Sequence, residues 1–180
     1  ERASMAGRVI ALDIFNEQLL DSEVQDADII VSLLPARLHP LVALSCLRHS
    51  KSLLTASYES AEMNEMSTRA KSQGILFLNE IGVDPGIDHM SAMQVINRLK
   101  KEAHELLCFE TFTGGLIAPE SDNNPWHYKL TWNPRNVVLA GQGGPARFIQ
   151  EGRFKNIPYH RLFRRTEVID IEGYGKFEGY

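Results

Sequence analysis

Short aliphatic runs alternate with amphipathic stretches through the first half of the chain. Nearly continuous apolar sequence occupies residues 28–35, 53–57 and 75–80, which is typical of strands that helices bury on both faces. Between them, apolar positions recur at helical spacing in residues 40–49 and 60–74. A strand–helix–strand–helix–strand order with short connections predicts right-handed βαβ units. The expected fold class is therefore α/β, with a partial Rossmann-like, doubly wound parallel sheet.

Residues that begin and end helices support this division. Ser60 can cap the helix that follows it, and Gly74 suits a helix C-terminus. Before the first buried run, residues 9–13 predict a short strand, and residues 16–24 predict a helix or turn. Residues 87–101 repeat apolar positions at helical spacing, so we expect a further helix there.

The organisation changes after that helix. Residues 106–113 return to a strand pattern, whereas residues 114–126 are rich in Gly, Pro, Asp and Asn and predict an irregular loop. Residues 133–140 open with an Asn-Pro pair, which predicts the first turn of a helix. Residues 147–180 are expected to form short strands and turns, so the second half of the chain has an α+β pattern.

Composition and charge narrow the classes of function. The chain has 180 residues, of which 43% are hydrophobic, enough for one substantial core or two small ones. The formal charge is -4, and Lys and Arg are scattered except at residues 161–165, which argues against a nucleic-acid partner. The longest apolar run, residues 29–34, is far shorter than the roughly 18–20 residues that cross a bilayer. We therefore expect a small-molecule ligand and no membrane association.

The cysteines indicate a reducing environment. Cys46 and Cys108 are too few for a disulfide framework, and neither has a neighbour at metal-ligand spacing. We expect both to be small core hydrophobes, with no metal site and a cytoplasmic location. No secretory signal is visible in the first residues, and we expect the true N-terminus to lie before Glu1.

The most distinctive polar residues follow the predicted strands. Ligands of doubly wound sheets bind at the carboxyl ends of the strands, and these ends carry Leu34, Ser57, Tyr58 and the loop at residues 82–86. Two glycines in this loop permit close approach of the backbone to a ligand, and the N-terminus of the next helix attracts an anion. Turn chemistry and helix capping are the alternative explanation of the same loop.

A second polar region follows between residues 114 and 132. Residues 120–124 are too polar to pack in a core, and residues 127–132 combine aromatic rings with a lysine and a histidine. Such a segment can form a wall for a nicotinamide ring and a carboxylate-bearing substrate. A solvated loop, with Tyr128 and Trp132 packed in a core, explains the pattern equally well.

Taken together, five segments resemble the saccharopine dehydrogenase family in order and spacing: residues 30–35, 55–58, 79–89, 114–125 and 128–135. The resemblance covers almost the whole chain. It implies a glutamate-forming enzyme of lysine metabolism, homodimeric, that uses NADP or NAD to oxidise the C–N bond of saccharopine. Hydride transfer gives an imine, which water opens to L-glutamate and aminoadipate semialdehyde.

The resemblance also implies domains and site roles. Residues 1–86 are expected to be the C-terminal part of a dinucleotide-binding domain, and residues 87–180 a truncated α+β domain for substrate binding or dimerisation. Contacts to the dinucleotide near its nicotinamide half are implied for Leu34, Asp84, Pro85, Gly86 and Asn133. Contacts to saccharopine are implied for Ser57 and Tyr58. The candidates for moving protons to and from nitrogen and water are Tyr58, Asp84, Asp88, His89 and Lys129.

The chain departs from the family pattern in three places. Thr113 stands where the family usually has a cysteine before two glycines, so a thiol role is in doubt. A Gly-rich strand–turn–helix before Glu1 and a substrate-binding arginine after Tyr180 are expected but are not in this sequence, so the chain alone is expected to be inactive. Two alternatives remain: an imine-reducing enzyme of polyamine synthesis similar to carboxynorspermidine dehydrogenases, and a non-catalytic dimerisation module on the same fold.

Overall fold

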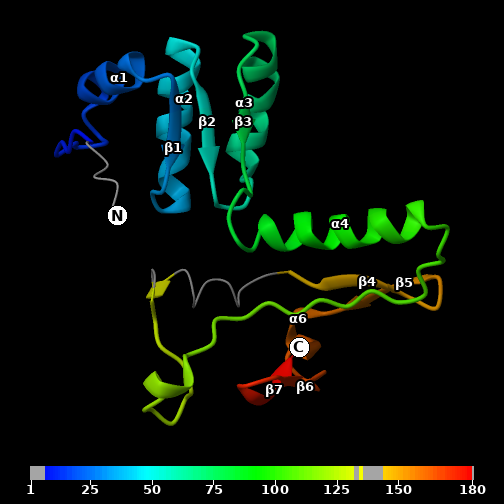
Figure 1. The fold of residues 1–180 in the computed structure, drawn as a ribbon. Helices are drawn as coiled ribbons and strands as arrows, with labels where there is room; N and C mark the ends of the chain where they lie inside the picture. Colours follow the sequence, from blue (N-terminus) through cyan, green and yellow to red (C-terminus); the bar gives the residue numbers. More distant parts are fainter. Residues whose placement is uncertain (1–6, 132–133, 136–143, 180) are drawn as a thin grey trace. The chain divides into compact units, whose positions relative to one another are not determined.

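The computed structural model describes residues 7–131, 134–135 and 144–179 (Figure 1). The chain divides into two compact units, Glu1–Thr111 and Phe112–Tyr180. The assignment of functional domains to residues 1–86 and 87–180 stays a prediction. The first unit contains, in chain order, α1 (Glu17–Asp26), β1 (Ile29–Ser32), the 3₁₀ turn η1 (Ala36–Leu38), α2 (His39–His49), β2 (Ser52–Thr55), α3 (Ala61–Ser72), β3 (Phe77–Leu78) and α4 (Ile87–Lys101).

The sheet of the first unit is parallel, with the strand order β1-β2-β3. Ile30 pairs with Leu53, and Ser32 pairs with Thr55. On the other side of β2, Leu53 pairs with Phe77. Because α2 connects β1 to β2 and α3 connects β2 to β3, the predicted βαβ organisation is confirmed.

Side-chain caps and a left-handed glycine explain where the helices begin and end. The Asn16 side chain accepts a hydrogen bond from the Leu19 N–H at 3.2 Å and so caps α1. The Ser60 hydroxyl accepts from the Met63 N–H at 3.2 Å and caps α3, as predicted. Gly74 follows α3 with φ of 69°, a conformation that favours glycine, which confirms its role as the stop.

The core lies between the helices and one face of the sheet. Leu53 of β2 and Cys46 of α2 are fully buried, and α1 contributes Leu20 and Val24 to the same cluster. The other face of β1 is exposed, since Val31 retains 60% of its accessible surface. The prediction that helices bury this strand on both faces is therefore wrong for the described residues, because α1, α2 and α3 all contribute to one core.

Two predicted strands are not strands in the structure. Residues 9–13 and 106–113 form no ladder with any described strand. An apolar run becomes a strand only where a neighbour accepts its backbone hydrogen bonds, and pattern alone does not reveal that neighbour. The helix predicted at residues 133–140 lies outside the described residues apart from residues 134–135.

The second unit is built from two hairpins and short turns. Its elements are the 3₁₀ turn η2 (Pro119–Ser121), β4 (Ala146–Gln150), β5 (Arg153–Ile157), the one-turn helix α6 (Tyr159–Leu162), β6 (Glu167–Ile171) and β7 (Gly175–Gly179). β4 pairs antiparallel with β5, and β6 with β7. Glu151 and Gly152 join the first pair, with φ of 52° and 70°. The predicted irregular loop and short strands are confirmed.

The two cysteines differ in environment. Cys46 is fully buried in α2, and burial raises the pKa of its thiol to about 12. Cys108 is exposed, so its predicted core position is wrong. No helix of the described residues combines the length and apolar character needed to cross a bilayer.

Asp21 joins α1 to α2 through a charged hydrogen-bond network. Its two carboxylate oxygens accept from Arg48 Nη2 at 2.7 Å and from Arg48 Nε at 3.0 Å. The Ser45 hydroxyl also donates to Asp21. The hydrogen bonds from Arg48 and then from Ser45 hold the pKa of Asp21 down, at about 2.

Asp21→Asn should lower the free energy of unfolding at neutral pH by about 1 kcal/mol or less, because the pair is partly exposed. A carboxyl group whose pKa is lower in the folded state stabilises the fold fully when the pH is above its unfolded-state pKa of about 3.9. The stabilisation is lost as the pH falls toward a folded-state value of about 2. Thermal unfolding of both proteins between pH 7 and pH 2 should therefore show a difference that shrinks below about pH 4. Asp26→Asn, at the exposed end of α1, is the control; a pH-independent difference for Asp21→Asn would contradict the assignment.

Candidate functional site

The carboxyl ends of β1, β2 and β3 meet at one edge of the sheet, which we call the strand-end site. The segment after β3 is tied to the segment after β2 by backbone hydrogen bonds. Glu80 N–H donates to the Ser57 carbonyl at 3.0 Å, and Ile81 N–H donates to the Thr55 carbonyl at 3.2 Å. The structure therefore brings Ser57 and Tyr58 close to the loop at residues 82–86, as the topology predicts.

The loop between β3 and α4 is tight. Gly82 N–H donates to the Pro85 carbonyl at 2.9 Å, and Ile87 N–H donates to the Gly82 carbonyl at 2.9 Å. Gly86 has φ of 145°, and a Cβ added there would lie 2.3 Å from the Gly82 oxygen. The peptide bond between Asp84 and Pro85 is cis. Only glycine fits at position 86, because the backbone of Gly82 occupies the space that a side chain would need. Gly86 is buried, so this requirement comes from the packing of the loop on itself.

Asp84, Asp88 and His89 gather where the loop enters α4. Their polar atoms lie within 4.8 Å of one another. Asp88 Oδ1 accepts from Gly86 N–H at 2.9 Å and lies 2.7 Å from His89 Nδ1. Burial acts to raise the pKa of Asp88, but hydrogen bonds from His89 and Gly86 outweigh it and lower the pKa. Exposed acidic groups of this kind are common in proteins without a bound ion.

Tyr58, in the segment that follows β2, is exposed and retains 67% of its accessible surface. Partial burial raises the pKa of its phenol, and the negative charges of Asp84, Glu80 and Asp88 raise it further. The phenol therefore stays protonated at neutral pH. It can donate a hydrogen bond to a ligand, and it is unsuited to act as a base.

A buried histidine links the ends of β1 and β2. His39, the first residue of α2, retains 2% of its accessible surface. Its Nδ1 lies 2.8 Å from Ser32 Oγ, and its Nε2 lies 2.8 Å from Ser57 Oγ and 2.9 Å from Thr55 Oγ1. Burial lowers the pKa of His39, so the ring is neutral at physiological pH.

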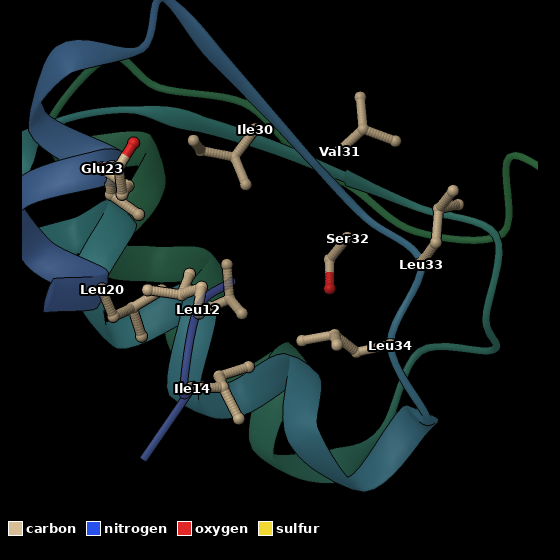
Figure 2. Close-up of a pocket in the computed structure, with 11 residues that line it drawn as sticks. Leu12, Ile14, Leu20, Glu23, Ile30, Val31, Ser32, Leu33 and Leu34 are labelled. Atoms are coloured by element: carbon tan, nitrogen blue, oxygen red, sulfur yellow. The ribbon is translucent and has the colours of Figure 1, made fainter. Parts of the chain in front are cut away.

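An apolar cavity of about 400 Å³ lies beside β1 (Figure 2). Leu12 and Ile14 come from the segment before α1, whereas Ile30, Ser32 and Leu34 come from β1 and the residues after it. In Figure 2, Leu34 and Leu12 point toward one another across the cavity. Leu34, a predicted cofactor contact, therefore lines an apolar space that reaches the carboxyl end of the strand.

The remaining predicted site residues lie elsewhere. Lys129 belongs to the second unit and is exposed, and Asn133 lies outside the described residues. In the same unit, Asn124 Nδ2 donates to the Tyr128 carbonyl at 3.0 Å, which fixes the turn before Lys129. Tyr128 is partly exposed and is therefore not a buried core residue.

Sequence reasoning missed His39 as a site residue. A signal existed: Ser32 and Thr55 place hydroxyls inside otherwise aliphatic strands, where a buried polar group needs a partner. The partner comes from the start of α2, and only the packing of that helix against the two strands reveals it.

Comparisons with known proteins agree along the chain. Residues 4–78 match the family model described as the saccharopine dehydrogenase NADP binding domain. Residues 82–180 match the model described as the saccharopine dehydrogenase C-terminal domain. The two matches adjoin just before the glycine loop, so they cover both sides of the strand-end site.

Relatives and a solved structure give the same result. Saccharopine dehydrogenase [NADP(+), L-glutamate-forming] of Pyricularia oryzae is 40% identical over 82% of this chain and 33% of its own length. Alpha-aminoadipic semialdehyde synthase of Arabidopsis thaliana is 39% identical over 86% of this chain and 14% of its own length. The apo structure of saccharopine dehydrogenase (L-Glu forming) from Saccharomyces cerevisiae superposes with a TM-score of 0.81 at 32% identity, covering 96% of this chain and 38% of that one.

The chain thus spans about a third of the fungal relatives and a smaller part of the plant one. Within that span, the parallel sheet, the strand-end loop and both family matches coincide. From this agreement we conclude that the chain belongs to the saccharopine dehydrogenase family.

Proposed function

We propose that the complete protein containing this chain is an NADP-dependent, L-glutamate-forming saccharopine dehydrogenase. The observation that carries the proposal is the strand-end site, where Ser57, Tyr58 and the loop at residues 82–86 converge at the carboxyl edge of a parallel sheet. That edge lies where the two family matches meet. Fungal relatives of similar sequence are named for this activity.

The residues at this edge fit a nicotinamide dinucleotide. The close packing of Gly86 on Gly82 fixes the shape of the loop, and Leu34 lines an apolar cavity suited to a flat ring. Asn79, next to β3, has a buried side-chain oxygen without a hydrogen-bond partner among the described residues, which a polar ligand group would satisfy. We assign Leu34, Asp84, Pro85 and Gly86 to the cofactor. Whether the protein uses NAD in place of NADP is tested by measuring saccharopine oxidation with each cofactor.

Ser57 and Tyr58 are suited to hold the substrate. Both carry hydroxyls beside the loop, and the raised pKa of Tyr58 keeps its phenol a donor at neutral pH. Saccharopine bears carboxylates, which accept hydrogen bonds from such groups more strongly than neutral acceptors do. Ser57 and Tyr58 follow β2 directly and therefore lie close to the loop residues that we assign to the cofactor.

Proton transfer falls to the acids and the histidine at the start of α4. When bound, the oxidised nicotinamide would supply the hydride acceptor for the CH2 carbon on the lysine side of the secondary nitrogen of saccharopine, the carbon that becomes the aldehyde. A protein base takes the nitrogen-bound proton, water adds to the resulting C=N bond, and the C–N bond breaks to release L-glutamate and aminoadipate semialdehyde. His89, oriented by Asp88 at 2.7 Å, is our first candidate base, with Asp84 as a further candidate.

Two further properties of the complete protein belong to the proposal. We propose a homodimer and a cytoplasmic location, the latter supported by the free thiols of Cys46 and Cys108. The related synthase of Bos taurus is named mitochondrial. Light scattering tests the dimer, and fluorescence localisation tests the compartment.

The complete protein should reduce NADP+ when saccharopine is added, because the groups that we assign to cofactor and substrate contact lie together at the strand-end site. The rate is measured by the absorbance of the reduced nicotinamide, with NAD+ and a carboxynorspermidine-type substrate in parallel. Turnover of the polyamine-type substrate alone would contradict the proposal in favour of that activity. Absence of turnover with every combination of cofactor and substrate would favour a non-catalytic module.

Asp84→Ala should lower kcat by at least about tenfold without unfolding the protein, because a strand-end loop positions ligands and contributes little to the core. Asp26→Ala is the matched control, since this exposed aspartate ends α1 near the opposite edge of the sheet. If Asp84→Ala kept the turnover and cofactor affinity of the unchanged protein, the loop residues would serve only to form the turn and to cap the helix.

Gly86→Ala should weaken NADP+ binding by at least about tenfold, because the added Cβ would meet the Gly82 oxygen at 2.3 Å and force the loop open. Gly7→Ala, which meets no atom within 4 Å, is the control. Calorimetric titration with NADP+ measures the affinity of both variants. Unchanged affinity in a folded Gly86→Ala protein would remove this loop from the cofactor site.

A further inference from the structure

We propose that His39 is a positioning residue that holds the Ser57 hydroxyl ready to donate a hydrogen bond to a carboxylate of the substrate. The inference rests on the proposed function, because it takes Ser57 as a substrate contact. His39 itself is buried and does not reach the ligand. Its effect passes through Ser57.

The geometry of the network supports this role. His39 Nε2 lies 2.8 Å from Ser57 Oγ, while Nδ1 is held by Ser32 Oγ at 2.8 Å. Ser57 is only partly buried, so one end of the network reaches the strand-end site and the other lies in the core. The Ser57 N–H also donates to Thr55 Oγ1 at 3.2 Å, so the backbone and the side chain of Ser57 are both held.

The tautomer of the neutral His39 ring decides whether the Ser57 hydroxyl hydrogen is free to bond to a ligand. Such a ring has one N–H donor and one acceptor nitrogen. If the Ser32 hydroxyl donates to Nδ1, then Nε2 carries the hydrogen and is a donor toward both the Ser57 oxygen at 2.8 Å and the Thr55 oxygen at 2.9 Å. The hydroxyl hydrogen of Ser57 is then available to a ligand. With the opposite tautomer, Nε2 accepts and competes with the ligand for that hydrogen, so we assign the Nε2–H form.

Amide side chains test the two halves of the ring separately. The amide of glutamine reaches the position of Nε2, whereas that of asparagine reaches only the position of Nδ1. In the complete protein, Ser57→Ala should raise KM for saccharopine at least about fivefold, the scale for loss of a hydrogen bond to a charged group. His39→Asn should raise KM similarly with kcat within about twofold, and His39→Gln should retain a KM closer to that of the unchanged protein.

The double variant separates positioning from a general effect on stability. If His39 acts through Ser57, the KM of Ser57→Ala/His39→Asn should equal that of Ser57→Ala within about twofold. The proposal would be overturned if the two substitutions multiplied their effects on KM, or if His39→Asn changed kcat alone. His49→Asn, at the other end of α2, is the control and should leave KM unchanged.

A second measurement does not depend on saccharopine turnover. Nitrogen-15 NMR of labelled histidine should show His39 as the neutral Nε2–H tautomer. Ser57→Ala should shift its ring signals, whereas Tyr58→Ala should not. The Nδ1–H tautomer, or no response to Ser57→Ala, would overturn the proposal. If the unchanged protein fails to oxidise saccharopine while the NMR result holds, the proposed substrate is wrong and the linkage of His39 to Ser57 stands.

Discussion

Burial of one face of the parallel sheet is the constraint on which the site depends. Leu53 in β2 is fully buried, and side chains alternate between the two faces of a strand. The register pairs Ser32 with Thr55, so both hydroxyls lie on the same inner face as Leu53. A slip of one residue would turn this set to the other face and leave the core without its apolar side chains.

Buried hydroxyls at the strand ends require partners, and the start of α2 supplies one. His39 meets Ser32, Thr55 and Ser57 at 2.8–2.9 Å, so both ring nitrogens are engaged. The ring is neutral because burial lowers its pKa. The same packing that stabilises the sheet therefore positions a hydroxyl at the ligand edge, and the site and the core share one hydrogen-bond network.

Sequence patterns predicted much of this fold for physical reasons that are local. Aliphatic runs and helical spacing located β1, β2, β3 and the helices between them, and Ser60 and Gly74 marked the ends of α3. The loop at residues 82–86 was expected because it contains two glycines and a proline, and Gly86 stands directly before a helix. Residues that depend on distant packing were less accessible: the role of His39, the exposure of Val31 and that of Cys108 follow from which elements cover them.

The proposed function requires that ligand binds at the strand-end site of the first unit. Hydrogen–deuterium exchange of the complete protein, with and without NADP+ and saccharopine, tests it most directly. We expect protection of peptides covering residues 55–60 and 80–89, whose backbone lies at this edge, and little change at residues 17–26 in α1. Protection confined to other parts of the protein, with unchanged exchange at residues 55–60 and 80–89, would contradict it.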